Sequence, residues 1–359
     1  MVRNIEWMPV VTPDEPRSTP QTSPASAPLA RLGYPAADNG LPSSPLSFPD
    51  GGAFRVEIPS VEGPAALTAV LDEAAARSVP IHRVSQGSGV MMQTDAEITE
   101  MVQACDAANI ELCLFLGPRA SWDAGGGRFT PAGNLGPRAR GAEQLAQCLE
   151  DALRAVELGV RCLLVGDEGV LWALHRLRTA GELPAELTLK VSALIGPANP
   201  ASFALFENLG ADSVNVPGDL SLAQLTDLRA AGRSAIDFYL ESPDNLGGFV
   251  RHYDGPELVR LLAPVYLKFG LRNAPDIYPS GGHLRAAVEQ SGRERVRRAE
   301  LGLALLERRG LLDQMSPLGS RLVGPLSRFA PAPAISDAAP TTATSAAATA
   351  GEPSPAAQR

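Results

Sequence analysis

The sequence has few of the features that nucleic-acid-binding or membrane proteins need. Aromatic residues make up only 5% of the 359 residues, and acidic side chains outnumber basic ones to give a net charge of −9. Proteins that bind nucleic acid usually carry a basic patch or stripe, so this composition argues against a nucleic-acid partner. No apolar run is long enough to span a bilayer, and residues 1–11 lack the apolar core of a signal peptide. We expect a cytoplasmic protein with no membrane partner.

Cysteine is also scarce. The four cysteines are Cys105, Cys113, Cys148 and Cys162, and no two of them form a C-x-x-C pair. Cys113 and Cys162 fall near the starts of predicted strands, whereas Cys105 and Cys148 fall within predicted helices. We interpret all four as reduced, buried, structural thiols, and we expect no iron–sulfur cluster on them.

The two ends of the chain differ in composition from its middle. Residues 1–52 are rich in Pro, Ser, Thr and Ala, and residues 313–359 form a linker followed by an Ala-, Pro- and Thr-rich stretch. Neither end has enough bulky apolar residues to offset the entropy lost on ordering, which predicts disordered tails. Residues 53–312 are rich in Leu, Val and Ala and are predicted to form one domain.

One unit repeats eight times between Phe54 and Leu312: a short apolar run, a loop with Gly, Pro and charged residues, and an amphipathic helix. Most repeats are roughly 23 to 30 residues long, the length of one βα unit. Eight such units in roughly 260 residues fit a (β/α)8 TIM barrel of the α/β class. The apolar runs begin near Phe54, Ile81, Glu111, Arg161, Leu187, Asp212, Ala235 and Val265.

The chemistry of a TIM barrel takes place at the carboxyl ends of its strands, so polar residues near the predicted strand ends are the site candidates. The candidates for catalysis are Glu62, Asp167, Glu168, Glu241, Lys268 and His283. The candidates for substrate binding are Arg83, Ser85, Gln86, Arg119, Asn215, Arg272 and Asn273.

Strands seven and eight are predicted to send charged side chains into the barrel. Side chains of a strand alternate between its two faces, so Asp237 and Glu241 point inward if Phe238 and Leu240 face the helices. By the same alternation, Lys268 and Arg272 point inward on the next strand. Such groups must pair or act on a ligand, because an unpaired charge there is very costly. The alternatives are a functional site and an internal salt-bridge network.

Three arginines at or just past predicted strand ends, Arg83, Arg119 and Arg272, favour an anionic substrate. They could instead pair with nearby acids. Those acids, Glu62, Asp167, Glu168 and Glu241, could alternatively hold a divalent metal through oxygen ligands. Glycines in the last two loops, residues 245–248 and 279–283, are compatible with a phosphate site but also with ordinary turns.

The stretch from Phe54 to Arg309 resembles bacterial proteins of the U32 peptidase family, also called collagenase-like proteases. The segments that carry the resemblance are Ile58-Pro-Ser-Val-Glu-Gly63, Val84-Ser-Gln-Gly-Ser-Gly89, Glu241-Ser-Pro-Asp244 and Tyr266-Leu-Lys-Phe-Gly-Leu-Arg-Asn-Ala-Pro275. The resemblance implies a barrel and a hydrolase. The chain departs from the family's peptidase signature, because it has no His-Gly pair and no cysteine beyond Cys162.

These observations lead to one functional hypothesis and two alternatives. We expect a hydrolase that acts on a small-molecule or peptide-like anionic substrate. The first alternative is a lyase or aldolase that uses Lys268 as a Schiff-base amine, or a divalent metal. The second is a ligand-binding barrel without catalytic activity. The oligomeric state and the substrate are left open.

Overall fold

Eight parallel strands close into a barrel in chain order. The structure is a computed structural model that describes residues 23–34, 39–117 and 138–319. The strands are β1 (Phe54–Pro59), β2 (Arg83–Ser85), β3 (Glu111–Phe115), β4 (Cys162–Val165), β5 (Thr188–Val191), β6 (Ser213–Asn215), β7 (Ala235–Glu241) and β8 (Val265–Phe269). The predicted TIM barrel is therefore confirmed, and each predicted apolar run begins within two residues of a strand.

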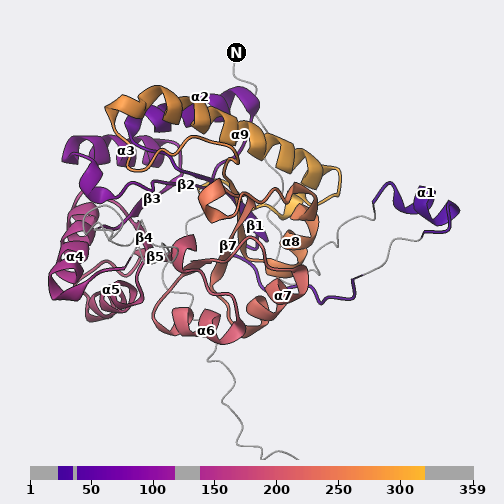
Figure 1. The fold of residues 1–359 in the computed structure, drawn as a ribbon, viewed down its shortest axis with the longest axis horizontal. Helices are drawn as coiled ribbons and strands as arrows, with labels where there is room; N and C mark the ends of the chain where they lie inside the picture. Colours follow the sequence, from indigo (N-terminus) through magenta and orange to yellow (C-terminus); the bar gives the residue numbers. More distant parts are fainter. Residues whose placement is uncertain (1–22, 35–38, 118–137, 320–359) are drawn as a thin grey trace, which may run out of the picture.

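Helices surround the barrel (Figure 1). They are α2 (Pro64–Arg77), α3 (Asp95–Ala107), α4 (Gly141–Glu157), α5 (Glu168–Ala180), α6 (Pro200–Asn208), α7 (Leu222–Ala231), α8 (Gly255–Leu262) and α9 (Arg285–Glu307), preceded by the short α1 (Ser26–Arg31). Single 3-10 turns in the loops are η1 (Val90–Met92), η4 (Ala193–Ile195), η5 (Asp244–Leu246), η6 (His252–Asp254), η7 (Gly282–Leu284) and η8 (Leu312–Gln314). None of these helices is long and apolar enough to cross a membrane.

Local capping determines where several helices begin. Thr94 and Glu97 form a capping box at the start of α3, in which each side chain satisfies the backbone N–H of the other residue. Asp167 accepts two backbone N–H groups at the start of α5. The same spacing of an N-cap residue and a glutamate occurs at Asp254 and Glu257, but the Asp254 side chain does not cap α8. Asp254 is already helical, and its carboxylate pairs with Arg251 at 2.7 Å.

The core has an apolar outer layer and a polar centre. Outward-facing residues of the strands, such as Val56, Ile58 and Leu114, pack against the helices in one continuous apolar cluster. A small apolar cluster of Cys113, Phe115, Cys162 and Leu164 faces the interior from β3 and β4. The rest of the interior is dominated by polar and charged side chains, which are described below.

The chain on either side of the predicted domain also packs on the barrel. The Phe48 side chain is 1% exposed, and its ring centroid lies 5.2 Å from that of Tyr266. Asp50 pairs with Arg55 at 2.7 Å, and the Ser316 N–H donates to the carbonyl of Phe54 at 3.0 Å. Contacts with the barrel therefore extend beyond the predicted tail limits, residues 52 and 313, on both sides. The remaining tail predictions, for residues 1–22, 35–38 and 320–359, lie outside the described residues.

Candidate functional site

Charged side chains occupy the barrel interior, where branched apolar side chains are usual. They project from β1, β2, β5, β7 and β8, and each is at most 2% exposed: Arg55, Glu57, Arg83, Lys190, Asp237 and Lys268. Burying a charge is costly unless it is paired. The contacts among these side chains satisfy that requirement, so the interior is a connected ionic network.

Glu57 is the centre of the network. One of its oxygens contacts the Nζ of Lys190 and lies 3.4 Å from Arg83 Nη1, and the other accepts the Ser85 hydroxyl at 2.7 Å. Lys268 Nζ lies 3.5 Å from Glu57 Oε1. Burial by itself would raise the pKa of Glu57, but Lys190, Lys268 and Arg83 outweigh it and hold that pKa well below its usual range. Glu57 is therefore a carboxylate that compensates several cations.

Arg83 lies deeper than the sequence suggested. It was placed at the end of a strand, but it is the first residue of β2 and its side chain is 0% exposed. Its guanidinium contacts Glu111 and lies 3.0 Å from Asp237, with the Tyr266 ring 3.6 Å away. The predicted position is corrected: Arg83 is enclosed by acids in the lower part of the barrel, away from the strand ends.

Lys268 lies at the carboxyl half of β8, and its amine has defined partners. Nζ donates to Asn215 Oδ1 at 2.6 Å, and the Asn215 Nδ2 donates in turn to the Val191 carbonyl at 2.6 Å. The Tyr239 ring centroid is 4.1 Å from Nζ. Burial and the nearby Lys190, opposed by Glu57, lower the pKa of Lys268 to about 8. At pH 7 about a tenth of this amine is therefore unprotonated.

The pKa of Lys190, the other lysine in the barrel interior, is shifted in the opposite direction. Its Nζ contacts Glu57 and lies 3.0 Å from Asp237. Burial would lower its pKa, but the two carboxylates outweigh burial and raise that pKa above its usual value. Lys190 thus stays charged while Lys268 can lose its proton. These are the only two lysines among the 31 Lys and Arg residues of the sequence, and both point into the barrel.

A cavity lies at the carboxyl ends of β5, β6 and β7, and its lining includes Tyr239, the ring next to the Lys268 amine, but not Lys268 itself. Its volume is about 280 Å³, and its lining includes Ala193, Val216, Tyr239, Ser242 and Phe249. Tyr239 therefore faces the cavity and also covers the Lys268 amine. Burial and the charge of Glu57 raise the pKa of Tyr239 above its usual value, so its phenol stays protonated.

Glu241 does not point into the barrel, contrary to the alternation predicted for β7. The pairing of β7 with β8 shifts register between Tyr239 and Glu241, as in a β-bulge. The Glu241 carboxylate instead lies 3.4 Å from His252 Nε2 and 3.2 Å from Arg298 Nε, and it accepts the Arg272 backbone N–H at 3.0 Å. The prediction that Glu241 points into the barrel is therefore wrong.

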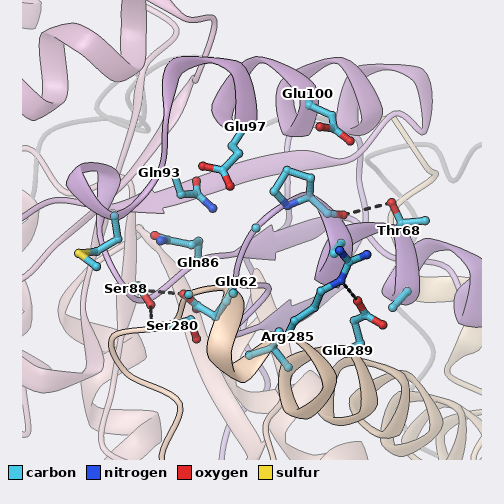
Figure 2. A pocket seen from close by; sticks show the side chains of 18 of the residues that line it. Glu62, Thr68, Gln86, Ser88, Gln93, Glu97, Glu100, Ser280, Arg285 and Glu289 are labelled. Carbon is cyan, nitrogen blue, oxygen red and sulfur yellow. Dashed lines mark hydrogen bonds and ion pairs between the residues drawn. The ribbon is translucent and has the colours of Figure 1, made fainter.

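Four other candidates support loops or helix starts. The Glu62 carboxylate accepts the N–H groups of Gly87 and Ser88 at 2.7 and 3.0 Å. The Gln86 side chain makes two hydrogen bonds with the backbone of Gly89. Both residues also line a second cavity, which Figure 2 shows. At the start of α5, Asp167 caps the helix and Glu168 pairs with Arg138.

The remaining candidates lie on the rim or outside the described residues. Arg272, Asn273 and His283 are exposed in the loop after β8. The Asn273 N–H donates to Asp244 at 2.7 Å, which ties that loop to the one after β7. Arg119 belongs to the segment 118–137, which lies outside the described residues. The described structure thus brings Arg83, Ser85 and Lys268 together around Glu57, with Asn215 bound to Lys268. The other described candidates lie elsewhere.

The acids proposed as metal ligands do not converge. Within residues 23–34, 39–117 and 138–319, no three His, Cys, Asp or Glu side chains form a group that could hold a metal ion. All four cysteines are buried free thiols. Cys113 and Cys162 are register partners on adjacent strands, and burial together with Cys113 raises the pKa of Cys162 well above its usual value. Cys162 is therefore a protonated thiol.

The sequence reasoning missed Glu57 and Lys190, which are central to the network. Two signals could have found them. In β1, Arg55 and Glu57 alternate with Phe54, Val56 and Ile58, which places two charges on the inner face of a strand. The scarcity of lysine is the second signal, since Lys190 and Lys268 both fall within predicted strands.

Comparisons with known proteins find only distant structural likenesses. No protein-family model matches the chain, and no curated protein matches it. Among solved structures, a U32 peptidase is 16% identical with a TM-score of 0.36, covering 52% of this chain and 69% of that one. A candidate copper homeostasis protein CutC from Streptococcus agalactiae is 18% identical with a TM-score of 0.41, covering 61% of this chain and 99% of that one. A candidate fructose-1,6-bisphosphate aldolase from Coccidioides immitis is 12% identical with a TM-score of 0.46, covering 72% and 91%.

Proposed function

We propose that the protein is an enzyme of the lyase or aldolase type, in which the Lys268 amine forms a Schiff base with a small carbonyl compound. The observation that carries the proposal is the setting of the Lys268 amine, which is buried, held by Asn215 and close to Lys190, so that its pKa is lowered to about 8. A lysine becomes a useful nucleophile when burial or a neighbouring cation favours its neutral form. Lys268 has both influences, whereas Lys190 next to it has two carboxylates and stays charged.

The neighbours of Lys268 suit the steps of Schiff-base formation. The neutral amine attacks the carbonyl carbon, and the resulting carbinolamine loses water to give a protonated imine. The water that leaves contains the carbonyl oxygen, one N–H proton of the amine and the proton that the ammonium released when it became neutral. The imine keeps the positive charge of the original ammonium, which Glu57, 3.5 Å from Nζ, already compensates. Asn215 fixes the direction of the attacking amine because its own amide is anchored on Val191.

The cavity beside Tyr239 supports a small substrate. Its volume of about 280 Å³ is near the lower limit for ligand pockets, which hold roughly 300 to 1,000 Å³. Lys268 is 2% exposed under the Tyr239 ring, so the ring must turn aside before a carbonyl group reaches Nζ. Replacing Tyr239 with alanine is therefore expected to speed imine formation with small carbonyl compounds.

The hydrolase hypothesis has less support from the described residues. Glu62, Asp167, Glu168 and Glu241 each accept backbone N–H groups or pair with arginine or histidine. Two carboxyl groups that act together as acid and base must face a common substrate. These four lie at three separate places: Glu62 follows β1, Asp167 and Glu168 begin α5, and Glu241 ends β7. We therefore rank imine chemistry above hydrolysis for this barrel.

Reductive trapping tests the proposal. The protein is incubated with pyruvate, glycolaldehyde or dihydroxyacetone, reduced with borohydride, and analysed by peptide mass spectrometry. We expect a stable adduct on Lys268 and none on Lys190, and the Lys268→Met variant should form no adduct while keeping its fold. Lys190 serves as the internal control because it is equally buried and is held as a cation.

Two results would contradict the proposal. An adduct confined to the chain's amino terminus would show that Lys268 is unreactive. Absence of any Lys268 adduct with all three compounds, even in the Tyr239→Ala variant, would favour a barrel that binds ligands without imine chemistry.

A further inference from the structure

A second cavity lies among α2, α3 and the start of α9 (Figure 2). Its volume is about 530 Å³, and its lining comes from the loops after β1, β2 and β8 and from the helices that follow them. It shares no lining residue with the cavity beside Tyr239. Its size falls within the range of pockets for small molecules, roughly 300 to 1,000 Å³.

The lining of this cavity is acidic. Four glutamates, Glu62, Glu97, Glu100 and Glu289, and two arginines, Arg285 and Arg293, line it, so the charge of the lining is −2. Arg285 pairs with Glu289 at 2.8 Å, and Arg293 Nη1 lies 3.7 Å from Glu73, outside the lining. The arginine charges are therefore directed at acids of the protein. An anion such as phosphate would meet net repulsion here, although the glycines of residues 279–283 had suggested a phosphate site.

A buried amide provides an independent sign that the cavity takes a hydrogen-bond donor. Gln93 is 8% exposed, and its Nε2 donates to Met101 Sδ at 3.4 Å. Its Oε1 has no hydrogen-bond partner among the described residues, 23–34, 39–117 and 138–319. A buried acceptor left without a donor costs about 1–3 kcal/mol. In Figure 2 the Gln93 side chain points into the cavity, towards the same space as Glu97 and Gln86.

Part of the wall is apolar. Ala65, Met92 and Val288 line the cavity together with the acidic groups. A ligand that fits this wall therefore carries its charge at one end and a short aliphatic segment behind it. Acidic oxygens and the Gln93 carbonyl are all acceptors, so the charged end must offer several N–H donors.

We propose that this cavity is a binding site for an alkyl guanidinium or alkyl ammonium group. The positive end lies near Glu97 and Glu100, beside the Gln93 amide, and the aliphatic stem packs against Met92 and Val288. Hydrogen bonds between a charged donor and an acceptor in a partly enclosed site are stronger than those between neutral groups.

Calorimetry with two nearly isosteric probes tests the proposal in the full-length protein. Butylguanidinium should bind at one site per chain, and butylurea, which has the same shape without the charge, should bind at least about tenfold more weakly. The affinity of butylguanidinium should also fall as salt is added, because screening weakens the attraction of the acidic lining.

Three variants locate the binding. Glu100→Gln should weaken butylguanidinium binding, whereas Glu157→Gln, the same change on an exposed residue of α4 outside the cavity, should have no effect. Gln93→Glu adds a carboxylate beside the guanidinium and should strengthen binding, provided that the melting temperature shows an intact fold. Equal affinities for the two probes, no detectable binding, or unchanged affinity in both Glu100→Gln and Gln93→Glu would overturn the proposal. Because no lining residue contacts Lys268, these outcomes are independent of imine trapping.

Discussion

Acidification should destabilise this barrel through a single buried histidine, His82. The His82 side chain is 3% exposed just before β2 and links two parts of the structure. Its Nδ1 accepts the Val56 backbone N–H at 3.1 Å, and its Nε2 lies 2.8 Å from the carbonyl of Ser316. These partners define the neutral tautomer with the proton on Nε2. A proton added to Nδ1 would face the Val56 N–H donor and break that hydrogen bond.

The size of the effect follows from the pKa. Burial, with Arg55 and Arg83 nearby, lowers the pKa of His82 from 6.5 to about 4, although the Ser316 carbonyl and Asp50 oppose this change. The unfolded chain therefore takes up a proton below pH 6.5, before the folded protein does. Stability from this group is full above pH 6.5 and is lost as the pH falls towards 4. At about 1.4 kcal/mol for each pH unit, the loss amounts to about 3 kcal/mol.

Urea denaturation of the wild type and of His82→Gln at pH 7 and pH 4 measures this loss. Glutamine can accept from Val56 and donate to Ser316 but does not titrate, so it serves as the matched control. The wild type should lose about 3 kcal/mol more than the variant over this interval. Carboxylates contribute equally to both proteins and cancel in the difference. An equal loss in the two proteins would show that His82 is not held neutral, and would refute the reasoning.

Three further changes have expected outcomes. Glu57→Gln leaves Lys190, Lys268 and Arg83 without their common carboxylate, so the free energy of unfolding should fall by about 3–5 kcal/mol. A fall below about 1 kcal/mol would mean that the network is not ionic. Phe48→Ala removes a ring that is 1% exposed and should lower the free energy of unfolding, measured with urea, by about 3–5 kcal/mol. Leu318→Ala, at a side chain that is 42% exposed, should lower it little. Equal losses would show that residues near Phe48 do not stabilise the barrel. The folded pKa of Lys268 is about 8 and its ordinary value is 10.5, so the free energy of unfolding of the wild type should rise by about 1 kcal/mol per pH unit from pH 8 to pH 10. An equal rise in the Lys268→Met variant would show that the gain does not come from Lys268.

The barrel itself could be predicted because its signal is spread over the whole chain. Each βα unit buries one apolar run, so the strand starts at Phe54, Glu111, Ala235 and Val265 match the predicted ones. An error in one unit leaves the other units, and therefore the fold class, unchanged. The same regularity predicted that the interior positions of β7 and β8 carry charges.

The site could be predicted only in part because its geometry depends on details within single strands. One register shift in β7 moves Glu241 from the interior to a contact with His252 and Arg298. Arg83 opens a strand that spans Arg83–Ser85 only, so a small error in the strand boundary moved it to the wrong end of the barrel. The contacts of Phe48 and Ser316 are made across the barrel floor by segments whose composition resembles that of tails. None of these features has a periodic signal in the sequence.

The central claim is that Lys268 is a neutral amine at a pH where Lys190 remains charged. Lysine-specific isotope labelling gives two side-chain signals, because the sequence contains only these two lysines. An NMR pH titration of the Cε and Nζ resonances measures both pKa values in one sample, and the Lys268→Met variant assigns them. The account predicts that one signal titrates at about pH 8, the pKa of Lys268, while the other shows no deprotonation below pH 10. Titration of the Lys268 signal near its ordinary value of 10.5 would contradict the account.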